Sequence, residues 1–239
     1  MKSHRFYSSI ELKENTSVEL SPDAAHHCTQ VLRYKPGDHL TVFNGDGFDY
    51  LATIEEIDKK RCQIKISSKK DPQNESPLKI NLVQGIARGD KMDLIIQKAV
   101  ELGVSEITPL FTERCNVKLE GKRLDKKLLH WNKTIISACE QSGRSIIPRL
   151  NAPISIDKLS KENSHTIYLE PNSGKKLTLL SIEESVRLLI GPEGGFSEKD
   201  LAHLNSIDCI GANIGSRILR TETAGLAVVS ILQARFGDF

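Results

Sequence analysis

Apolar and polar residues alternate with a period of two in the first third of the chain, a pattern typical of half-buried β-strands. Between two of these runs, the sequence Asn-Gly-Asp-Gly at 44–47 favours a tight hairpin turn. One helix is expected from the N-cap Ser21 to about residue 32, because Pro22 suits its first turn. Short strands, tight turns and one helix predict a small barrel-like β domain. The expected strands cover residues 40–43, 48–57 and 62–66.

The polar segment 67–77 contains two prolines and has no periodicity, so we expect a linker between a first domain, 1–72, and a second, 73–239. After it, strand and helix patterns alternate, which predicts an α/β fold with a mainly parallel sheet. The final helix, 222–235, is apolar on most faces and must be buried inside the domain or at a subunit interface. The other expected elements are strands 79–86, 106–110, 166–169, 186–190 and 207–214, and helices 92–102, 124–141 and one starting at Ser197.

A glycine loop, Gly-Pro-Glu-Gly-Gly at 191–195, follows the strand 186–190. Next comes a helix start with Ser197 as N-cap and Asp200 in the capping-box position. Open α/β proteins bind ligands at such strand–loop–helix junctions, because the backbone there approaches a small molecule closely and presents free N–H groups. The loop lacks the Lys-Ser/Thr of a P-loop and the spacing of dinucleotide folds, so phosphate is not its obvious ligand.

A second loop, Gly211–Arg217, also leads from a strand to a helix, with Thr221 or Thr223 able to cap that helix. Each loop alone is weak evidence, because tight turns use glycine for steric reasons. Two such loops at the ends of successive strands predict the walls of one pocket.

Composition describes an ordinary globular protein with 38% hydrophobic residues, 27% charged residues and a net charge of +2. Residues 78–150 carry thirteen basic and eight acidic side chains, which permits a polyanionic partner and is equally compatible with a solvated charged face. No stretch approaches a membrane span. The five scattered cysteines favour reduced thiols in a cytoplasmic protein, and the adjacent residues His26–Cys28 do not suit a metal site.

Two C-terminal motifs, Ile190–Ser197 and Gly215–Ala224, contain the two glycine loops. Further motifs span nearly the whole chain: His4–Phe6, His26 with Val31–Arg33, Arg88–Asp93, Gln97–Val104, Thr112–Arg114 and Glu140–Arg144. Together these motifs resemble those of the RsmE family, SPOUT-class methyltransferases that modify N3 of a uridine in small-subunit (16S) ribosomal RNA.

This resemblance implies a PUA-like RNA-binding β-barrel domain followed by a SPOUT domain with a C-terminal trefoil knot. It also implies a homodimer that binds S-adenosyl-L-methionine in the knot, needs no metal and acts on 16S rRNA or the small ribosomal subunit. The cofactor walls it implies are Leu169, Glu170, Pro171, Ile190, Gly191, Pro192, Glu193, Gly194, Gly195, Ile214, Gly215, Ile218, Leu219, Arg220 and Thr223.

Methyl transfer to N3 must also remove the proton of that nitrogen. Arg220 is the expected stabiliser of negative charge on the uracil oxygens, and Glu222 the expected proton acceptor or partner of that arginine. An ordinary ion pair at a helix start is the alternative for both residues. The side chains expected to contact RNA are Arg5, Arg33, Arg88, Lys91, Arg114 and Arg144.

Three other functions are compatible with parts of this pattern. A ribose 2′-O-methyltransferase of the same fold would leave the methyl on the ribose. An RNA-binding assembly factor without catalysis would not bind the cofactor. A nucleotide-binding enzyme is disfavoured by the absent phosphate motifs.

Overall fold

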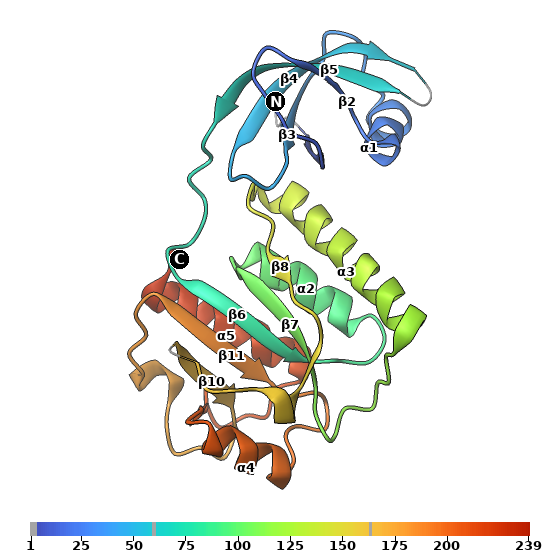
Figure 1. Ribbon diagram of the computed structural model, residues 1–239. Helices are drawn as coiled ribbons and strands as arrows, with labels where there is room; N and C mark the ends of the chain where they lie inside the picture. Colours follow the sequence, from blue (N-terminus) through green and yellow to red (C-terminus); the bar gives the residue numbers. More distant parts are fainter. Residues whose placement is uncertain (1–3, 59–60, 163) are drawn as a thin grey trace. The chain divides into compact units, whose positions relative to one another are not determined.

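The computed structural model describes residues 4–58, 61–162 and 164–239, which form two compact units. The first unit contains the chain up to Glu75 together with Cys139–Ile147, and the second contains Ser76–Ala138 and Pro148–Phe239. Figure 1 shows the course of the chain through both units.

The first unit is built on a five-stranded sheet in the order β1-β3-β4-β5-β2. The hairpin predicted at 44–47 is confirmed, because β3 and β4 pair antiparallel on either side of it. Register shifts in the β4–β5 ladder bend the sheet around an apolar core that includes Phe6, Leu40 and Ile64. In the described residues the ladder ends at β1 and β2, so the expected barrel is a curled open sheet. The strands are β1 (Arg5–Tyr7), β2 (Ser17–Glu19), β3 (His39–Phe43), β4 (Asp49–Ile57) and β5 (Cys62–Lys70).

The predicted helix of this unit begins as expected, with Ser21 accepting a hydrogen bond from the Ala24 N–H and Pro22 in the first turn. It comprises α1 (Pro22–His26) and a wider π-helical turn, η1 (His27–Val31). Two predictions need correction. The short strands β1 and β2 escaped the sequence pattern, and the linker begins later than residue 67 because β5 continues to Lys70.

The second unit is built on a seven-stranded sheet in the order β12-β10-β11-β6-β7-β8, with β9 also pairing to β7. Every pairing recorded in it is parallel, which confirms the predicted α/β architecture. The strands are β6 (Lys79–Gly85), β7 (Glu106–Phe111), β8 (Arg149–Leu150), β9 (Ile154–Ser155), β10 (His165–Leu169), β11 (Ser185–Ile190) and β12 (Ile210–Ala212).

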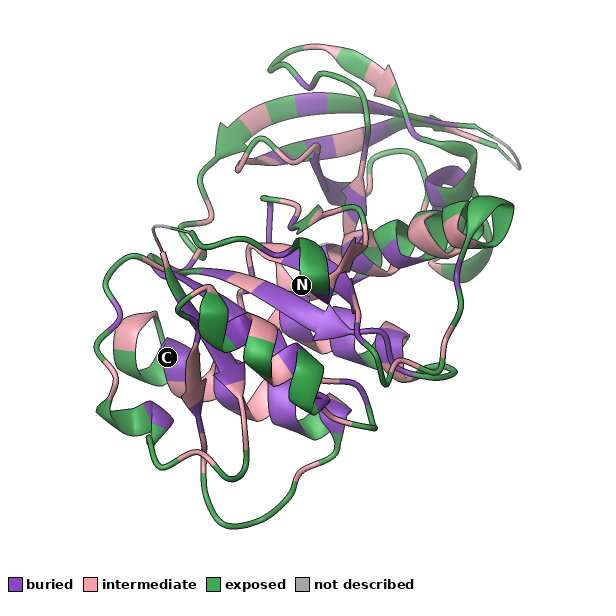
Figure 2. Ribbon diagram, turned by 60° about the horizontal axis from the view of Figure 1, so that its bottom comes forward, coloured by how far each residue is buried: buried purple, intermediate pink, exposed green. Residues whose placement is uncertain are grey.

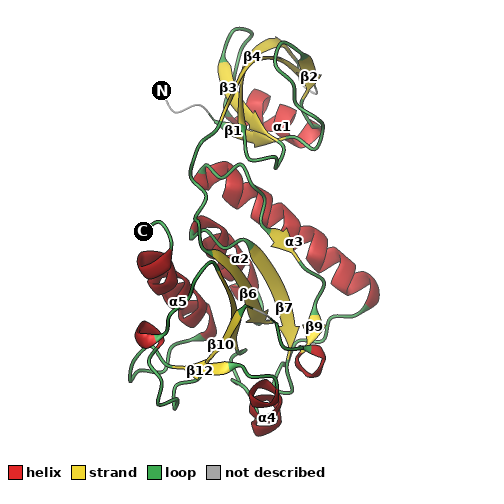
Figure 3. Ribbon diagram, turned by 60° about the vertical axis from the view of Figure 1, so that its left-hand side comes forward, coloured by secondary structure: helices red, strands yellow, loops and turns green. Residues whose placement is uncertain are grey.

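The central strands of this sheet are buried on both faces (Figure 2). On one face α5 packs against α2, β6 and β11; on the other, α4 covers a core that includes Val83, Leu189 and Leu204 (Figure 3). The helices are α2 (Lys91–Glu101), α3 (Gly121–Ser142), α4 (Glu198–Ser206) and α5 (Thr221–Phe236), with short 3-10 turns η2 (Ile156–Lys158) and η3 (Leu177–Leu179).

The two helices that follow the glycine loops begin differently. The Ser197 side chain accepts from the Asp200 N–H while the Asp200 carboxylate accepts from the Ser197 N–H, so the predicted capping box of α4 is confirmed. At α5 the prediction is wrong, because Arg220 is the N-cap position and makes no side-chain cap. The expected strand 207–214 is also shorter, since α4 and its following turn extend to Asp208.

Candidate functional site

Three loops at the carboxyl ends of parallel strands line one cavity of about 650 Å³ in the second unit. The loops follow β10, β11 and β12, which lie side by side with β6 in the sheet. Carboxyl ends of parallel strands meet at one edge, so residues far apart in sequence converge there. The two glycine loops predicted to wall one pocket do so, together with a third loop after β10.

Two glycines leave room for a ligand in this cavity. Gly195 has φ +66° and Gly215 has φ +142°, conformations that L side chains rarely adopt. A Cβ built at either position meets no protein atom within 4 Å, although both residues line the cavity. Two positions of the cavity lining are therefore bare backbone with open space where a side chain would begin.

The loop after β11 is anchored to the body of the sheet. The Thr221 hydroxyl donates to the Gly191 carbonyl (2.6 Å) and accepts from the Gln84 side-chain amide (2.9 Å). Gln84 is fully buried, and Gly85 beside it lets Pro192 approach so closely that a Cβ there would lie 2.4 Å from its nitrogen. These contacts between β6, α5 and the loop fix the position of one cavity wall.

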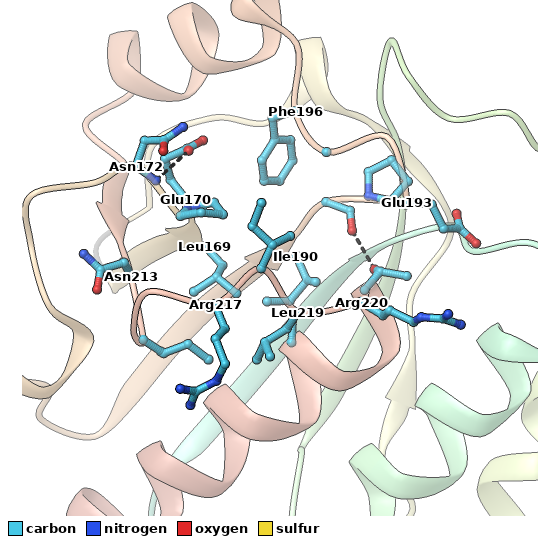
Figure 4. A pocket seen from close by; sticks show the side chains of 18 of the residues that line it. Leu169, Glu170, Asn172, Ile190, Glu193, Phe196, Asn213, Arg217, Leu219 and Arg220 are labelled. Atoms are coloured by element: carbon cyan, nitrogen blue, oxygen red, sulfur yellow. Dashed lines mark hydrogen bonds between the residues drawn. The ribbon is translucent and has the colours of Figure 1, made fainter.

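The cavity has an apolar interior with polar groups on two sides (Figure 4). Leu169, Ile190 and Phe196 are among the apolar residues that line it. Four residues are expected to pack around an adenine ring: Ile190, Ile214, Ile218 and Leu219. All four line the cavity, but Ile218 is 85% exposed. Such an apolar lining with a few oriented polar groups is typical of a small-molecule site.

On one side of the cavity a lysine joins two carboxylates. Lys91 Nζ lies 3.3 Å from Glu193 Oε1 and 3.4 Å from Glu222 Oε2. Burial opposes ionisation of Glu193, but its hydrogen bonds, including the one from the Arg88 N–H, and the Lys91 ammonium outweigh this and lower its pKa. Glu222 Oε2 is buried and accepts no hydrogen bond from the described residues, so its ion pair with Lys91 leaves a lone pair free.

Most of the predicted cofactor residues lie together. Those lining the cavity are Leu169, Glu170, Pro171, Ile190, Gly191, Pro192, Glu193, Gly195, Ile214, Gly215, Ile218, Leu219 and Arg220. Gly194 does not line it, because its Cα faces Arg114, where a Cβ would lie 3.0 Å from the Arg114 Cβ. Thr223, exposed on the first turn of α5, does not line it either, and Glu222, also outside the lining, is paired with the lining residue Lys91. Sequence reasoning missed Asn172, Phe196, Leu201, Asn213, Thr221 and Ala224 as lining residues.

The six side chains predicted to contact RNA lie in three different environments. Arg5 and Arg144 are largely buried in the first unit, where they pair with Asp49 and Glu75, respectively, so their positive charges are already compensated. Lys91 and Arg114 line the cavity, and Arg114 donates to the carbonyls of Gly194 (3.2 Å) and Phe196 (3.3 Å). Arg33 and Arg88 are exposed.

Candidate metal-binding side-chain groups and candidate membrane-spanning helices are both absent from the described residues. Within the described residues, no group of three or more His, Cys, Asp or Glu side chains is placed to hold a metal ion. None of the helices described is both long and apolar enough to cross a membrane.

Comparison with known proteins gives a consistent result. Residues 74–233 match the family model of the RNA methyltransferase domain, and residues 20–67 match that of the RNA methyltransferase PUA domain. The chain is 40% identical to ribosomal RNA small subunit methyltransferase E of Buchnera aphidicola from Schizaphis graminum, over 98% of this chain and 97% of that protein.

Two solved structures are similar over their full length. A methyltransferase from Legionella pneumophila, solved with its bound cofactor SAM, has a TM-score of 0.95 at 41% identity and 100% coverage of both chains. Ribosomal RNA small subunit methyltransferase E from Neisseria gonorrhoeae, bound to S-adenosyl methionine, has a TM-score of 0.91 at 36% identity, again with 100% coverage of both chains.

Proposed function

The chain belongs to the RNA methyltransferase family that includes ribosomal RNA small subunit methyltransferase E, and from this premise we propose that it methylates N3 of a uridine in 16S rRNA with S-adenosyl-L-methionine as the donor. The observation that carries the proposal is the cavity walled by three loops at the carboxyl edge of the sheet. The P-loop lysine and the dinucleotide spacing are absent from its loops, so phosphate is not the obvious ligand, and a cofactor without phosphate agrees with this.

The residues of the cavity fit this cofactor. The volume of about 650 Å³ lies in the range of small-molecule sites, and the open backbone at Gly195 and Gly215 accommodates a ligand in close contact. Apolar side chains such as Ile190 and Leu219 suit an adenine ring, while backbone N–H and C=O groups suit its polar edge and the ribose. When bound, the cofactor supplies a methyl group made electrophilic by its sulfonium and leaves as a neutral thioether.

The charged side of the cavity is where the uracil binds. Figure 4 shows Arg220 and Glu193 on the side opposite Glu170, Asn172 and Asn213. There the exposed Arg220 guanidinium stabilises negative charge that develops on the uracil oxygens. Alignment of N3 with the methyl group by the cavity walls supplies much of the remaining acceleration.

Glu222 accepts the proton that N3 loses. Its Oε2 atom is buried and has no hydrogen-bond donor among the described residues, so a lone pair is free to receive a proton. Lys91 Nζ lies 3.4 Å from that oxygen and holds the carboxylate in place. The structure pairs Glu222 with Lys91, and this lysine is therefore a positioning residue in the reaction rather than a phosphate contact.

The second domain comprises residues 73–239, and its C-terminal part forms the trefoil knot. Two features support it: β10 lies between β12 and β11, and α5, which follows the edge strand β12, packs on β6 and β11. The protein acts as a homodimer in the cytoplasm, and the partly exposed apolar residues Leu226 and Ile231 on α5 suit a subunit interface. The first domain, residues 1–72, binds RNA, consistent with its match to a PUA domain.

Nucleoside mass spectrometry tests this function. The protein is incubated with methyl-labelled cofactor and either 16S rRNA or small subunits that lack the modification. The expected product is 3-methyluridine, with the label retained on the free base. Label retained on the ribose after base release would establish a 2′-O-methyltransferase instead, and the absence of cofactor binding by calorimetry would leave an RNA-binding factor without catalysis.

A further inference from the structure

A second cavity, of about 540 Å³, lies in the second unit beside the cofactor cavity. It is formed by the loop after β6, the loop after β7 and the first turns of α3. Four basic side chains line it, Arg88, Lys118, Arg123 and Lys127, and Asp90 is the one acidic side chain among the described residues that line it. The lining therefore carries a formal charge of +3.

In residues 4–58, 61–162 and 164–239, none of these four cations forms an ion pair with a carboxylate. Arg187 of the same unit differs, because it is paired with Glu162. Like charges gathered in a concave site repel one another and raise the local positive potential, and an anionic ligand relieves this repulsion.

The base of this cavity is apolar. Met92, Leu119 and Trp131 line it and are almost fully buried. The Trp131 indole N–H is already used, because it donates to Asp93 at 3.0 Å. Cations around an apolar base suit a ligand with a phosphate and a flat or apolar part, which is the chemistry of a nucleotide in RNA.

The two cavities share a wall. Residues 88–92 cover the turn after β6 and the first residues of α2. Within this segment Lys91 lines the cofactor cavity, while Arg88, Asp90 and Met92 line the second cavity. The Arg88 N–H also donates to Glu193, a residue of the cofactor cavity (3.1 Å). An RNA strand whose target uridine enters the first cavity therefore has its neighbouring backbone beside the second.

We infer that the second cavity binds a nucleotide adjacent to the target uridine, with Arg88, Lys118, Arg123 and Lys127 contacting the phosphate backbone. This inference rests on the proposed RNA methyltransferase function. In this role the second cavity holds the RNA strand while the target base is unstacked and enters the cofactor cavity.

A charge-matched pair of double variants tests the inference. Arg123→Gln with Lys127→Gln removes two cations from the cavity, whereas Lys122→Gln with Lys126→Gln removes two exposed cations from the same helix outside it. Glutamine keeps helix propensity close to that of the residues replaced, so α3 is retained in both. Thermal unfolding and cofactor affinity are measured for each variant as checks of folding and of the first cavity.

Binding of a short single-stranded 16S rRNA fragment with one central uridine is then followed by fluorescence anisotropy over a range of salt concentrations. The cavity variant is expected to bind about tenfold or more weakly, and its salt slope to fall by about 0.7 for each phosphate that the protein no longer neutralises. The control variant is expected to keep both the affinity within about threefold and the slope. Equal weakening in the two variants, or unchanged binding by the cavity variant, would overturn the inference.

The wild-type methylation assay separates this result from the proposed function. If the wild type forms 3-methyluridine and the cavity variant binds RNA as the control does, only the second-cavity site is wrong. If the wild type forms no methyluridine while the cavity variant still binds RNA more weakly than the control, the site stands as an RNA site and the catalytic assignment fails.

Discussion

Adding one methyl group at Gly85, which does not line the cofactor cavity, should displace the loop after β11, which does. A Cβ at this position would lie 2.4 Å from the Pro192 nitrogen, 2.7 Å from its Cδ and 2.8 Å from the Gly191 carbonyl carbon. Real Cβ atoms essentially never approach so closely, and none of the three atoms belongs to a side chain that can rotate away. Gly85→Ala must therefore move backbone.

The size of the effect follows from overpacking. Forcing a methyl group into a filled site typically costs about 1–3 kcal/mol. If the cost remains in the folded state, the melting temperature falls by about 2–12 °C for a unit of this size. If the loop after β11 shifts instead, the same free energy appears as cofactor binding that is about 5- to 150-fold weaker, because binding must restore the original loop.

Thermal unfolding and titration calorimetry with S-adenosylmethionine measure the two contributions. Gly174→Ala is the matched control, since its φ is outside the left-handed region and no atom lies within 4 Å of an added Cβ. It is expected to change stability by less than about 0.5 kcal/mol and leave the affinity unchanged. If Gly85→Ala matches this control in both measurements, the close approach of the loop to β6 and its role in the cofactor site are refuted.

Arg220→Ala is expected to lower single-turnover methyl transfer about 100-fold while the cofactor Kd changes far less, and the reverse pattern would make Arg220 a binding residue. Thr221→Val removes the donor to the Gly191 carbonyl and should cost about 1–3 kcal/mol in thermal unfolding, with weaker cofactor binding, whereas Thr221→Ser keeps the hydroxyl and both properties. Burial raises the pKa of Glu140 from its ordinary value of 4.5, despite the hydrogen bond from the Tyr7 N–H. The folded state thus binds the proton of the Glu140 carboxyl more tightly than the unfolded state does. The resulting stabilisation against unfolding is present below pH 4.5 and is lost as pH rises through the folded pKa. Glu140→Gln should remove this pH dependence from the urea-unfolding midpoint, and a midpoint that changes with pH in parallel with that of the wild type would contradict the reasoning.

Local signals in the sequence predicted most of the elements. The Asn-Gly-Asp-Gly turn, the Pro22 helix start and the Ser197 capping box act over a few residues, so they are readable without knowledge of tertiary contacts. The prediction of caps at Thr221 or Thr223 failed for the opposite reason. The Thr221 hydroxyl is used by Gly191 and Gln84, which lie 30 and 137 residues away in sequence.

The assembly of the first unit was not readable from the sequence. Its three-residue strands β1 and β2 are too short to show periodicity, and Cys139–Ile147 joins the unit from more than 60 residues beyond its first segment. Arg5 and Arg144 were predicted to contact RNA because they are basic residues in matching motifs. Only the structure shows that Asp49 and Glu75 neutralise them within the unit.

The charged cluster beside the cofactor cavity depends on strand order, which explains why sequence spacing could not predict it. Lys91 follows β6 and Glu193 follows β11, about 100 residues later, yet β6 and β11 are parallel neighbours from Lys79–Ser185 to Gln84–Ile190. Glu222 joins them because α5 packs back over the same two strands. A lysine that looked like an RNA contact is thereby held between two carboxylates, whereas the four cations of the second cavity form no ion pair with a carboxylate of the described residues. If RNA binds beside the cofactor, the charges of these four cations are available to its phosphates.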